Sequence, residues 1–171
     1  MKICLISKYP PIEGGVSSKN YWLAKALGER GHKVFVVTNA WEVEDEYREK
    51  FNGDDLKKYQ PRNVKVFNTD FAGNYRHVPY SKSYVERLSS LAIEVIEGYN
   101  CDLIDSKYII PYVVSGYLAS QFTERPQLLR HAGSDITRLI NSPYFNKLFI
   151  KIFERVDKIA TIPTLKETFI N

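Results

Sequence analysis

Short apolar runs alternate with longer amphipathic stretches along the 171 residues of this chain. A short apolar run with little alternation is typical of a strand buried on both faces, whereas apolar residues three or four positions apart are typical of a helix. The runs predict strands at 2–7, 33–38, 64–67, 101–105, 127–131 and 158–163. The stretches between them predict helices at 16–29, 83–98, 110–122 and 144–155, and another that begins near the end of the sequence.

The alternation of strands and helices predicts the fold class. Parallel neighbouring strands need a crossover connection, and a helix usually supplies it. We therefore expect an α/β protein with a Rossmann-like, doubly wound parallel sheet of about six strands, flanked by helices. The sequence contains no internal repeat and no low-complexity linker, so we expect residues 1–171 to form a single domain.

Two segments interrupt this pattern. Residues 41–60 are dense in charges of both signs, which favours a solvated insertion or a surface helix. Residues 68–81 form a long loop rich in Asn, Gly, Tyr and Pro, and such loops are usually functional or mobile.

Composition and charge narrow the class of protein. Apolar residues make up 44% and charged residues 26% of the chain, as in an ordinary globular domain. The net charge of +4 is spread along the sequence, which disfavours a nucleic-acid binder. Cys4 and Cys101 lie outside any metal-binding motif and are interpreted as buried apolar residues in a reducing compartment. No membrane span or signal peptide is found, so we expect a soluble cytoplasmic protein.

Polar segments follow four of the predicted strands. Open α/β sheets bind ligands outside the carboxyl ends of their strands, so these segments should share one rim. The candidate substrate-binding residues in and beside them are Gly14, Gly15, Val16, Lys19, Arg76, Lys107, Ser134 and Asp135, and the candidate catalytic residue is His131.

Gly14 and Gly15 come just before a predicted helix. Free backbone N–H groups and the helix dipole favour an anion there, and glycine lets a ligand approach the backbone. The alternative is a plain tight turn. The dinucleotide fingerprint G-x-G-x-x-G and the phosphate-binding motif G-x-x-x-x-G-K-[ST] are both absent, which disfavours a Rossmann dehydrogenase and a P-loop enzyme.

His131 ends a predicted strand and enters a Gly-Ser-Asp turn. A histidine here can donate to a hydroxyl or a phosphate, and the alternative is a hydrogen-bonded rim residue without a catalytic role. Asp135 has the alternative role of capping the following helix. The three histidines lack the spacing of a zinc site, and no serine has the G-x-S-x-G context of an acyl-transfer nucleophile.

These motifs together resemble a known family. The opening "MKICLISKYPPIEGGVSSKNYWLAKALGERGHKVFVVT" resembles that of the retaining GT-B glycosyltransferases of family four, in which a Pro-rich Gly-Gly loop precedes a helix ending in L-x-x-x-G-H-x-V. The segments "CDLIDSKY", "LLRHAGSDI" and "VDKIATIPTLKETF" resemble later strands of the same N-terminal domain, in the same order.

The resemblance implies half of a two-domain enzyme. In that family the N-terminal domain mostly binds the acceptor, and a C-terminal domain, which would be absent from this chain, mostly binds the nucleotide-sugar donor. The resemblance therefore implies an acceptor-binding domain that is inactive alone, a donor substrate in place of a cofactor, no metal, and a sugar, lipid or other acceptor. Contact with a membrane surface is compatible with it, and nucleic acid is not expected as a partner.

The resemblance also assigns roles to residues. Gly14 and Gly15 would lie against the donor diphosphate or the acceptor, and His131 would bond near the transferred sugar or an acceptor phosphate. The family often has a histidine after the fourth strand, where this chain has Ser106 and Lys107. Lys107 could instead serve an anionic acceptor. Two alternatives stay open, namely half of a sugar-nucleotide epimerase and a non-catalytic module that binds a sugar, a phosphate or a protein.

Overall fold

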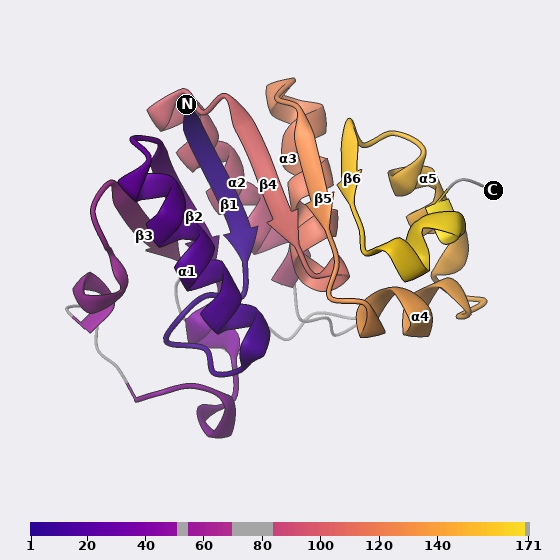
Figure 1. The fold of residues 1–171 in the computed structure, drawn as a ribbon, viewed down its shortest axis with the longest axis horizontal. Helices are drawn as coiled ribbons and strands as arrows, with labels where there is room; N and C mark the ends of the chain where they lie inside the picture. Colours follow the sequence, from indigo (N-terminus) through magenta and orange to yellow (C-terminus); the bar gives the residue numbers. More distant parts are fainter. Residues whose placement is uncertain (51–54, 70–83, 170–171) are drawn as a thin grey trace, which may run out of the picture.

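Figure 1 shows the fold as a computed structural model, which describes residues 1–50, 55–69 and 84–169. The described strands form one fully parallel sheet in the order β3-β2-β1-β4-β5-β6. They are β1 (Lys2–Ser7), β2 (Lys33–Thr38), β3 (Val64–Asn68), β4 (Leu103–Lys107), β5 (Gln127–Arg130) and β6 (Lys158–Ala160). The predicted doubly wound parallel sheet is confirmed.

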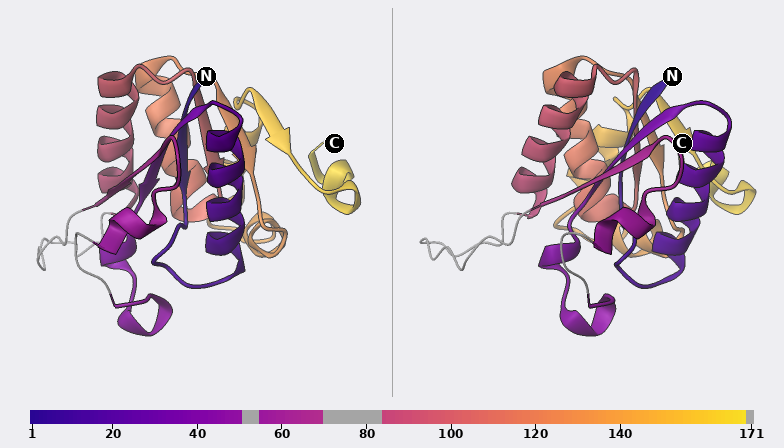
Figure 2. Two further views of the ribbon diagram at one scale, coloured as in Figure 1. Left: turned by 60° about the vertical axis from the view of Figure 1, so that its left-hand side comes forward. Right: turned by 90° about the vertical axis from the view of Figure 1, so that its left-hand side faces the viewer.

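Helices cover both faces of the sheet. Figure 2 shows α1 on one side and α2 with α3 on the other. The α-helices are α1 (Gly15–Glu29), α2 (Tyr84–Tyr99), α3 (Val114–Thr123), α4 (Ser134–Ile140) and α5 (Asn146–Phe153). Shorter helical turns are η1 (Ala40–Glu42), η2 (Asp45–Tyr47), η3 (Asp55–Tyr59), η4 (Ile109–Val113) and η5 (Pro163–Phe169).

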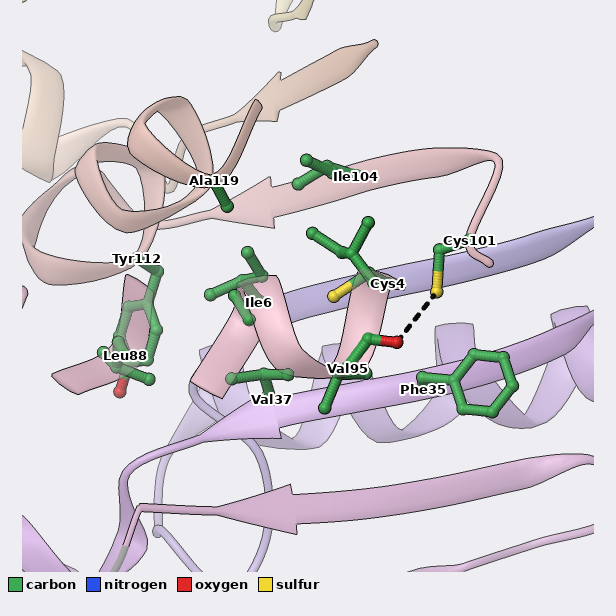
Figure 3. Close-up of a cluster of buried hydrophobic side chains, with 12 residues drawn as sticks. Cys4, Ile6, Phe35, Val37, Leu88, Val95, Cys101, Ile104, Tyr112 and Ala119 are labelled. Carbon is green, nitrogen blue, oxygen red and sulfur yellow. Dashed lines mark hydrogen bonds between the residues drawn. The ribbon is translucent and has the colours of Figure 1, made fainter. Parts of the chain in front are cut away.

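Alternate residues of the central strands feed two hydrophobic cores. On the α2–α3 side, Cys4 and Ile6 of β1 pack with Leu88 of α2 and Ala119 of α3, as Figure 3 shows. On the α1 side, Leu5 and its neighbours on β2 pack against Ala24. Successive side chains of a strand point to opposite faces, which explains why a central strand needs a nearly continuous apolar run.

A third cluster lies at the β6 end of the sheet. Leu129 of β5 packs there with Ile109, Ile136 of α4, and Phe149 and Ile152 of α5. This cluster holds α4 and α5 near the last two strands, and in Figure 1 α4 runs along the lower edge, where the strands end.

The strand at 101–105 was predicted two residues too early. Cys101 and Asp102 belong to the connection from α2, and the strand runs on through Lys107. The polar residues at its end remain in the strand because Asp105 pairs with Arg130, and Ser106 accepts a hydrogen bond from Gln127. Tertiary partners of this kind are invisible to a local hydrophobicity pattern.

Other predicted boundaries also change. The strands predicted at 127–131 and 158–163 end earlier, at Arg130 and Ala160. The helix predicted at 144–155 is shorter, and α4 was not predicted because its first residues were interpreted as a turn. The helix predicted at 110–122 starts later, after η4, and the last segment forms the turn η5.

The charged segment at 41–60 contains no long surface helix in its described part. It holds η1, η2 and η3, and residue Arg48 forms an isolated antiparallel bridge with Ile12. The predicted loop at 68–81 falls mostly outside the described residues, as does the start of the helix predicted at 83.

Candidate functional site

The strand order reverses between β1 and β4. The chain runs from β1 outward to β2 and β3, and then returns to place β4 on the other side of β1. Ser7, the last residue of β1, is in register with Lys107, the last residue of β4. The loops that follow these two strands diverge to opposite sides at such a point, which makes the crevice between them the usual ligand site of an open α/β sheet.

Residues 8–14 leave β1 as a loop that ends at the start of α1, and we call it the glycine loop. Gly14 has φ 115°, a conformation that L side chains rarely adopt, and no side chain caps the helix that follows. A Cβ atom built on Gly15 would meet no atom within 4 Å. The packing of the chain therefore does not require glycine at position 15, and the space beside it is open to a ligand.

Cationic residues end the strands beside this loop: Lys107 of β4 is in register with Ser7 of β1 and with Arg130 of β5. Lys107 at the end of β4 interacts electrostatically with Arg130 of β5 and Lys19 of α1. Burial lowers the pKa of the Lys107 ammonium group, the two neighbouring cations lower it further, and Asp105 and Asp135 partly offset this. A negatively charged ligand would stabilise the charged form of such a lysine, so this position favours an anion.

The cations lie on the α1 side of the sheet. Asp105 is in register with Leu5, which packs in the core under α1, and Lys107 shares the face of Asp105 because it is two residues further along β4. The Nε atom of Arg130 donates to Asp105 over 2.6 Å. The Nη2 atom of Arg130 is buried, and the structure gives it no hydrogen-bond acceptor.

The Asp105–Arg130 pair is buried, with only 7% of the carboxylate side chain exposed. Burial raises the pKa of Asp105, and the attraction of Arg130 offsets only part of this effect. Neither residue was among the predicted site residues. The sequence did contain a signal for them: Asp105 is a charged residue inside a strand that is otherwise buried on both faces. Such a charge needs a partner of opposite sign.

Both ring nitrogens of His131 are engaged within the chain. The N–H of Gly133 donates to Nδ1 over 3.0 Å, so the proton of the neutral ring is on Nε2, which lies 2.7 Å from Oγ1 of Thr161. Burial lowers the pKa of His131, and Lys107 lowers it further against the opposing effect of Asp135. His131 is therefore arranged as a neutral hydrogen-bond donor, and its catalytic role stays a prediction.

Asp135 is buried and its carboxylate is occupied by the backbone. It accepts hydrogen bonds from the N–H groups of Ile109 and Ala132, over 3.0 and 2.9 Å, and from that of Ile136. These contacts tie the connection after β4 to the start of α4. Asp135 is not the predicted cap, because it lies inside α4, whose N-cap is Gly133 and has no side-chain cap hydrogen bond. The neighbouring Ser134 is exposed.

The remaining predicted residues are distributed as follows. Val16 is half-buried in the first turn of α1, and Lys19 is exposed one turn further along. Arg76 lies outside the described residues. Lys107 interacts electrostatically with Lys19, Arg130 and His131. Asp105 and Asp135 act on the same group of cations with the opposite sign.

The part of the chain that the structure describes lacks a metal-binding cluster and a membrane-spanning helix. No three His, Cys, Asp or Glu side chains of that part are grouped so that they could hold a metal ion. No helix in that part is both long enough and apolar enough to cross a membrane.

Comparison with known proteins gives one similar sequence and several similar structures. No protein-family model matches this sequence. The chain is 28% identical over 159 residues to the N-acetyl-alpha-D-glucosaminyl L-malate synthase of Bacillus anthracis. The match covers 92% of this chain and 38% of that enzyme, so the chain spans well under half of its length.

The similar structures share the fold at low sequence identity. Anabaena HepE, solved in complex with UDP and glucose, has a TM-score of 0.59 at 17% identity, covering 99% of this chain and 40% of that one. A Listeria monocytogenes protein assigned as a UDP-N-acetylglucosamine 2-epimerase has a TM-score of 0.58 at 14% identity, covering 99% and 41%. Together with the strand order, these similarities show that the chain has the Rossmann-like α/β fold of the GT-B glycosyltransferases.

Proposed function

We propose that this chain is the acceptor-binding part of a glycosyltransferase that moves a sugar from a nucleotide-sugar donor to an acceptor with an anionic group. The observation that carries the proposal is that Lys107 and Arg130 are in register at the ends of β4 and β5, where the strand order reverses and next to β1, whose loop leads into the uncapped start of α1. Its similarity to an enzyme named for N-acetylglucosaminyl transfer to L-malate supports the same class of reaction.

The start of α1 is proposed to contact the diphosphate of the donor. Its first backbone N–H groups have no partner within the helix, and together with the helix dipole they favour a phosphate oxygen. The open space beside Gly15 allows such an oxygen to approach the backbone.

The acceptor is proposed to bind through Lys107, with Arg130 and Lys19 nearby. A carboxylate or phosphate at this position would relieve the mutual repulsion of the cations and raise the pKa of Lys107 toward its ordinary value.

His131 is proposed to donate its Nε2–H to the transferred sugar or to the acceptor, in exchange for its present partner Thr161. The transfer is proposed to retain the anomeric configuration and to depend on donors and cations that stabilise the leaving diphosphate. Because the chain spans 38% of its relative, we propose that residues outside it supply most of the donor contacts and that the chain alone is inactive.

A sugar-transfer assay of the whole protein that carries this chain tests the proposal. UDP-sugars serve as donors, and L-malate, inorganic phosphate and glycerol serve as acceptors. We expect product with L-malate or phosphate and none with glycerol. Lys107→Gln should raise the KM for the anionic acceptor about 10- to 150-fold, since a charge-assisted hydrogen bond of about 1.5–3 kcal/mol is lost, and should leave the KM for the donor within about twofold.

The matched control is Lys33→Gln, which removes an exposed lysine at the opposite end of the sheet and should change neither KM. Equal acceptor KM values for the Lys107→Gln and unmodified proteins would remove Lys107 from the acceptor site. Nuclear magnetic resonance of the product reports its anomeric configuration, and inversion would contradict the proposed retention.

An epimerase is the second candidate, because one similar structure is assigned to a UDP-N-acetylglucosamine 2-epimerase. The two reactions differ in their need for an acceptor. Conversion of the sugar nucleotide to its 2-epimer, without any acceptor, would favour the epimerase over the transferase.

A further inference from the structure

Residues 43–49 of the charged segment run beside the glycine loop, and we call them the strap. Two backbone hydrogen bonds join them: Glu13 N–H donates to the Tyr47 carbonyl over 2.8 Å, and Glu49 N–H donates to the Pro11 carbonyl over 3.0 Å. Between these bonds Ile12 and Arg48 form an antiparallel bridge. The glycine loop thus gains a backbone partner from a segment more than 30 residues away in the sequence.

The side chain of Arg48 fixes the shape of the strap. Its Nε donates to the Val43 carbonyl over 2.9 Å, and its Nη2 pairs with Asp45. Its guanidinium group lies 5.5 Å from the ring centroid of Trp41, within cation–π distance. Only 15% of the Arg48 side chain is exposed, although the segment around it is dense in charge and largely exposed.

Both ends of the strap are fixed to the rest of the molecule. Just before it, Ala40 N–H donates to the Asn68 side chain over 2.7 Å, and Glu42 pairs with Arg87 of α2. At the other end, the Glu49 carboxylate accepts from the hydroxyl group of Tyr59. The Tyr59 carbonyl in turn accepts from Tyr9 at the start of the glycine loop, over 3.0 Å.

We propose that the strap positions the glycine loop for its ligand, and that Arg48 is the positioning residue that keeps the strap in the required shape. This inference rests on the proposed function, in which Gly14 and Gly15 contact a diphosphate. A loop ordered before binding loses less conformational entropy when the ligand arrives, so the strap increases affinity without touching the ligand. This assigns a role to the charged segment that differs from that of a solvated insertion.

Amide hydrogen exchange of the 171-residue chain tests the positioning directly. In Arg48→Ala we expect the amides of Glu13 and Glu49 to exchange at least tenfold faster, while those of β2 stay within about twofold of the unmodified chain. Arg48→Lys keeps a positive donor and should stay within about threefold. Lys50→Ala, which removes an exposed neighbouring charge, is the matched control and should have no effect.

Titration with inorganic pyrophosphate, followed by the amide resonances of Gly14 and Gly15, tests the consequence for binding. We expect the Kd to rise about five- to tenfold in Arg48→Ala and to be largely restored in Arg48→Lys. Unchanged exchange at Glu13 in Arg48→Ala would overturn the inference, and so would equally faster exchange throughout the fold, which would make Arg48 a residue of general stability.

The two proposals fail in different ways. If pyrophosphate shifts neither glycine amide in the whole protein that carries this chain, the proposed diphosphate contact is wrong. Faster exchange confined to the glycine loop and strap would still support the positioning role of Arg48 in that case.

Discussion

The two edges of the same sheet use polar side chains differently. At the amino edge, two carboxylates accept hydrogen bonds from the backbone N–H of the first residue of a strand. Asp102 accepts from Lys2 over 2.7 Å, and Asp157 accepts from Gln127 over 2.8 Å. At the carboxyl edge, Lys19, Lys107 and Arg130 gather near two carboxylates, one of which is occupied by Arg130 and the other by the backbone. These carboxylates at the amino edge thus complete strand starts, whereas those at the carboxyl edge interact electrostatically with Lys107.

The amino edge contains an open hollow. An open depression of about 360 Å³ lies there, and its lining residues are Ser120, Gln121, Glu124, Arg125, Pro126, Arg155 and Asp157. Its arginines and carboxylates balance in charge, and Arg155 lies 3.4 Å from the hydroxyl group of Tyr117. The hollow is thus lined by balanced charges, whereas the candidate site at the carboxyl edge combines neighbouring cations with the glycine loop.

The largest expected difference between the edges is in how much the free energy of unfolding falls when an arginine is removed. Arg130→Met leaves Asp105 buried without its partner and should lower the free energy of unfolding by about 3 kcal/mol. Arg125→Ala, which removes a hydrogen bond to Asn100 at the amino edge, should cost under about 1 kcal/mol. Urea denaturation measures both.

The double variant Asp105→Leu with Arg130→Met is the control for this prediction. Replacing both charges with apolar groups should restore most of the lost stability, because no unpaired charge remains buried. A double variant as unstable as Arg130→Met would show that the loss comes from packing.

A smaller difference is expected between two aspartates. Asp135→Asn puts an NH₂ group where the carboxylate accepts three backbone N–H groups, and should cost about 2 kcal/mol. Asp102→Asn changes an exposed side chain with one backbone contact and should cost under about 1 kcal/mol. Thermal unfolding of the two variants side by side would refute the comparison if the costs were equal.

The pH dependence of His131 is the third test. Because burial lowers its pKa in the folded chain, the unfolded chain binds the proton more readily, and the free energy of unfolding should fall as the pH drops from about 6.5 through the folded pKa. Protonation of Nδ1 also removes the acceptor of Gly133 N–H. A resonance titration of the His131 ring and the Gly133 amide measures both, and a midpoint above 6.5 would contradict the expected direction.

The smallest expected effect on stability comes from Gly15→Ala. Alanine has the higher helix propensity and meets open space, so the free energy of unfolding should change by under about 1 kcal/mol, in the stabilising direction. Gly14→Ala should instead destabilise the chain by about 1–2 kcal/mol because of its positive φ. A marked loss of stability in Gly15→Ala would show that glycine 15 serves the fold rather than a ligand.

The sheet and its central strands could be predicted because burial on both faces leaves a local apolar signal. Strands 2–7 and 33–38 match their predicted limits for this reason. The end of β4 could not be predicted, because Asp105 and Ser106 are kept in the strand by Arg130 and Gln127, which lie more than 20 residues further along the chain.

The candidate site was partly predictable for a similar reason. The positions of Gly14, Lys107 and His131 follow from the rule that loops meet at the carboxyl edge. Their partners do not: nothing near His131 in the sequence points to Thr161, and nothing near Gly14 points to the strap. Contacts between distant segments decide how such residues are held, and a single sequence does not contain them in readable form.

Under the proposed role of His131, its contact with Thr161 means that a ligand binds the imidazole only by replacing the threonine. The neutral imidazole has only one ring proton to give, and Thr161, just beyond β6, already receives it. A sugar hydroxyl that takes this proton must displace the threonine, so the net gain is the difference between two similar bonds. A change that weakens the packing of the segment after β6 should therefore strengthen ligand binding at His131. A change that holds this segment more firmly should weaken ligand binding there.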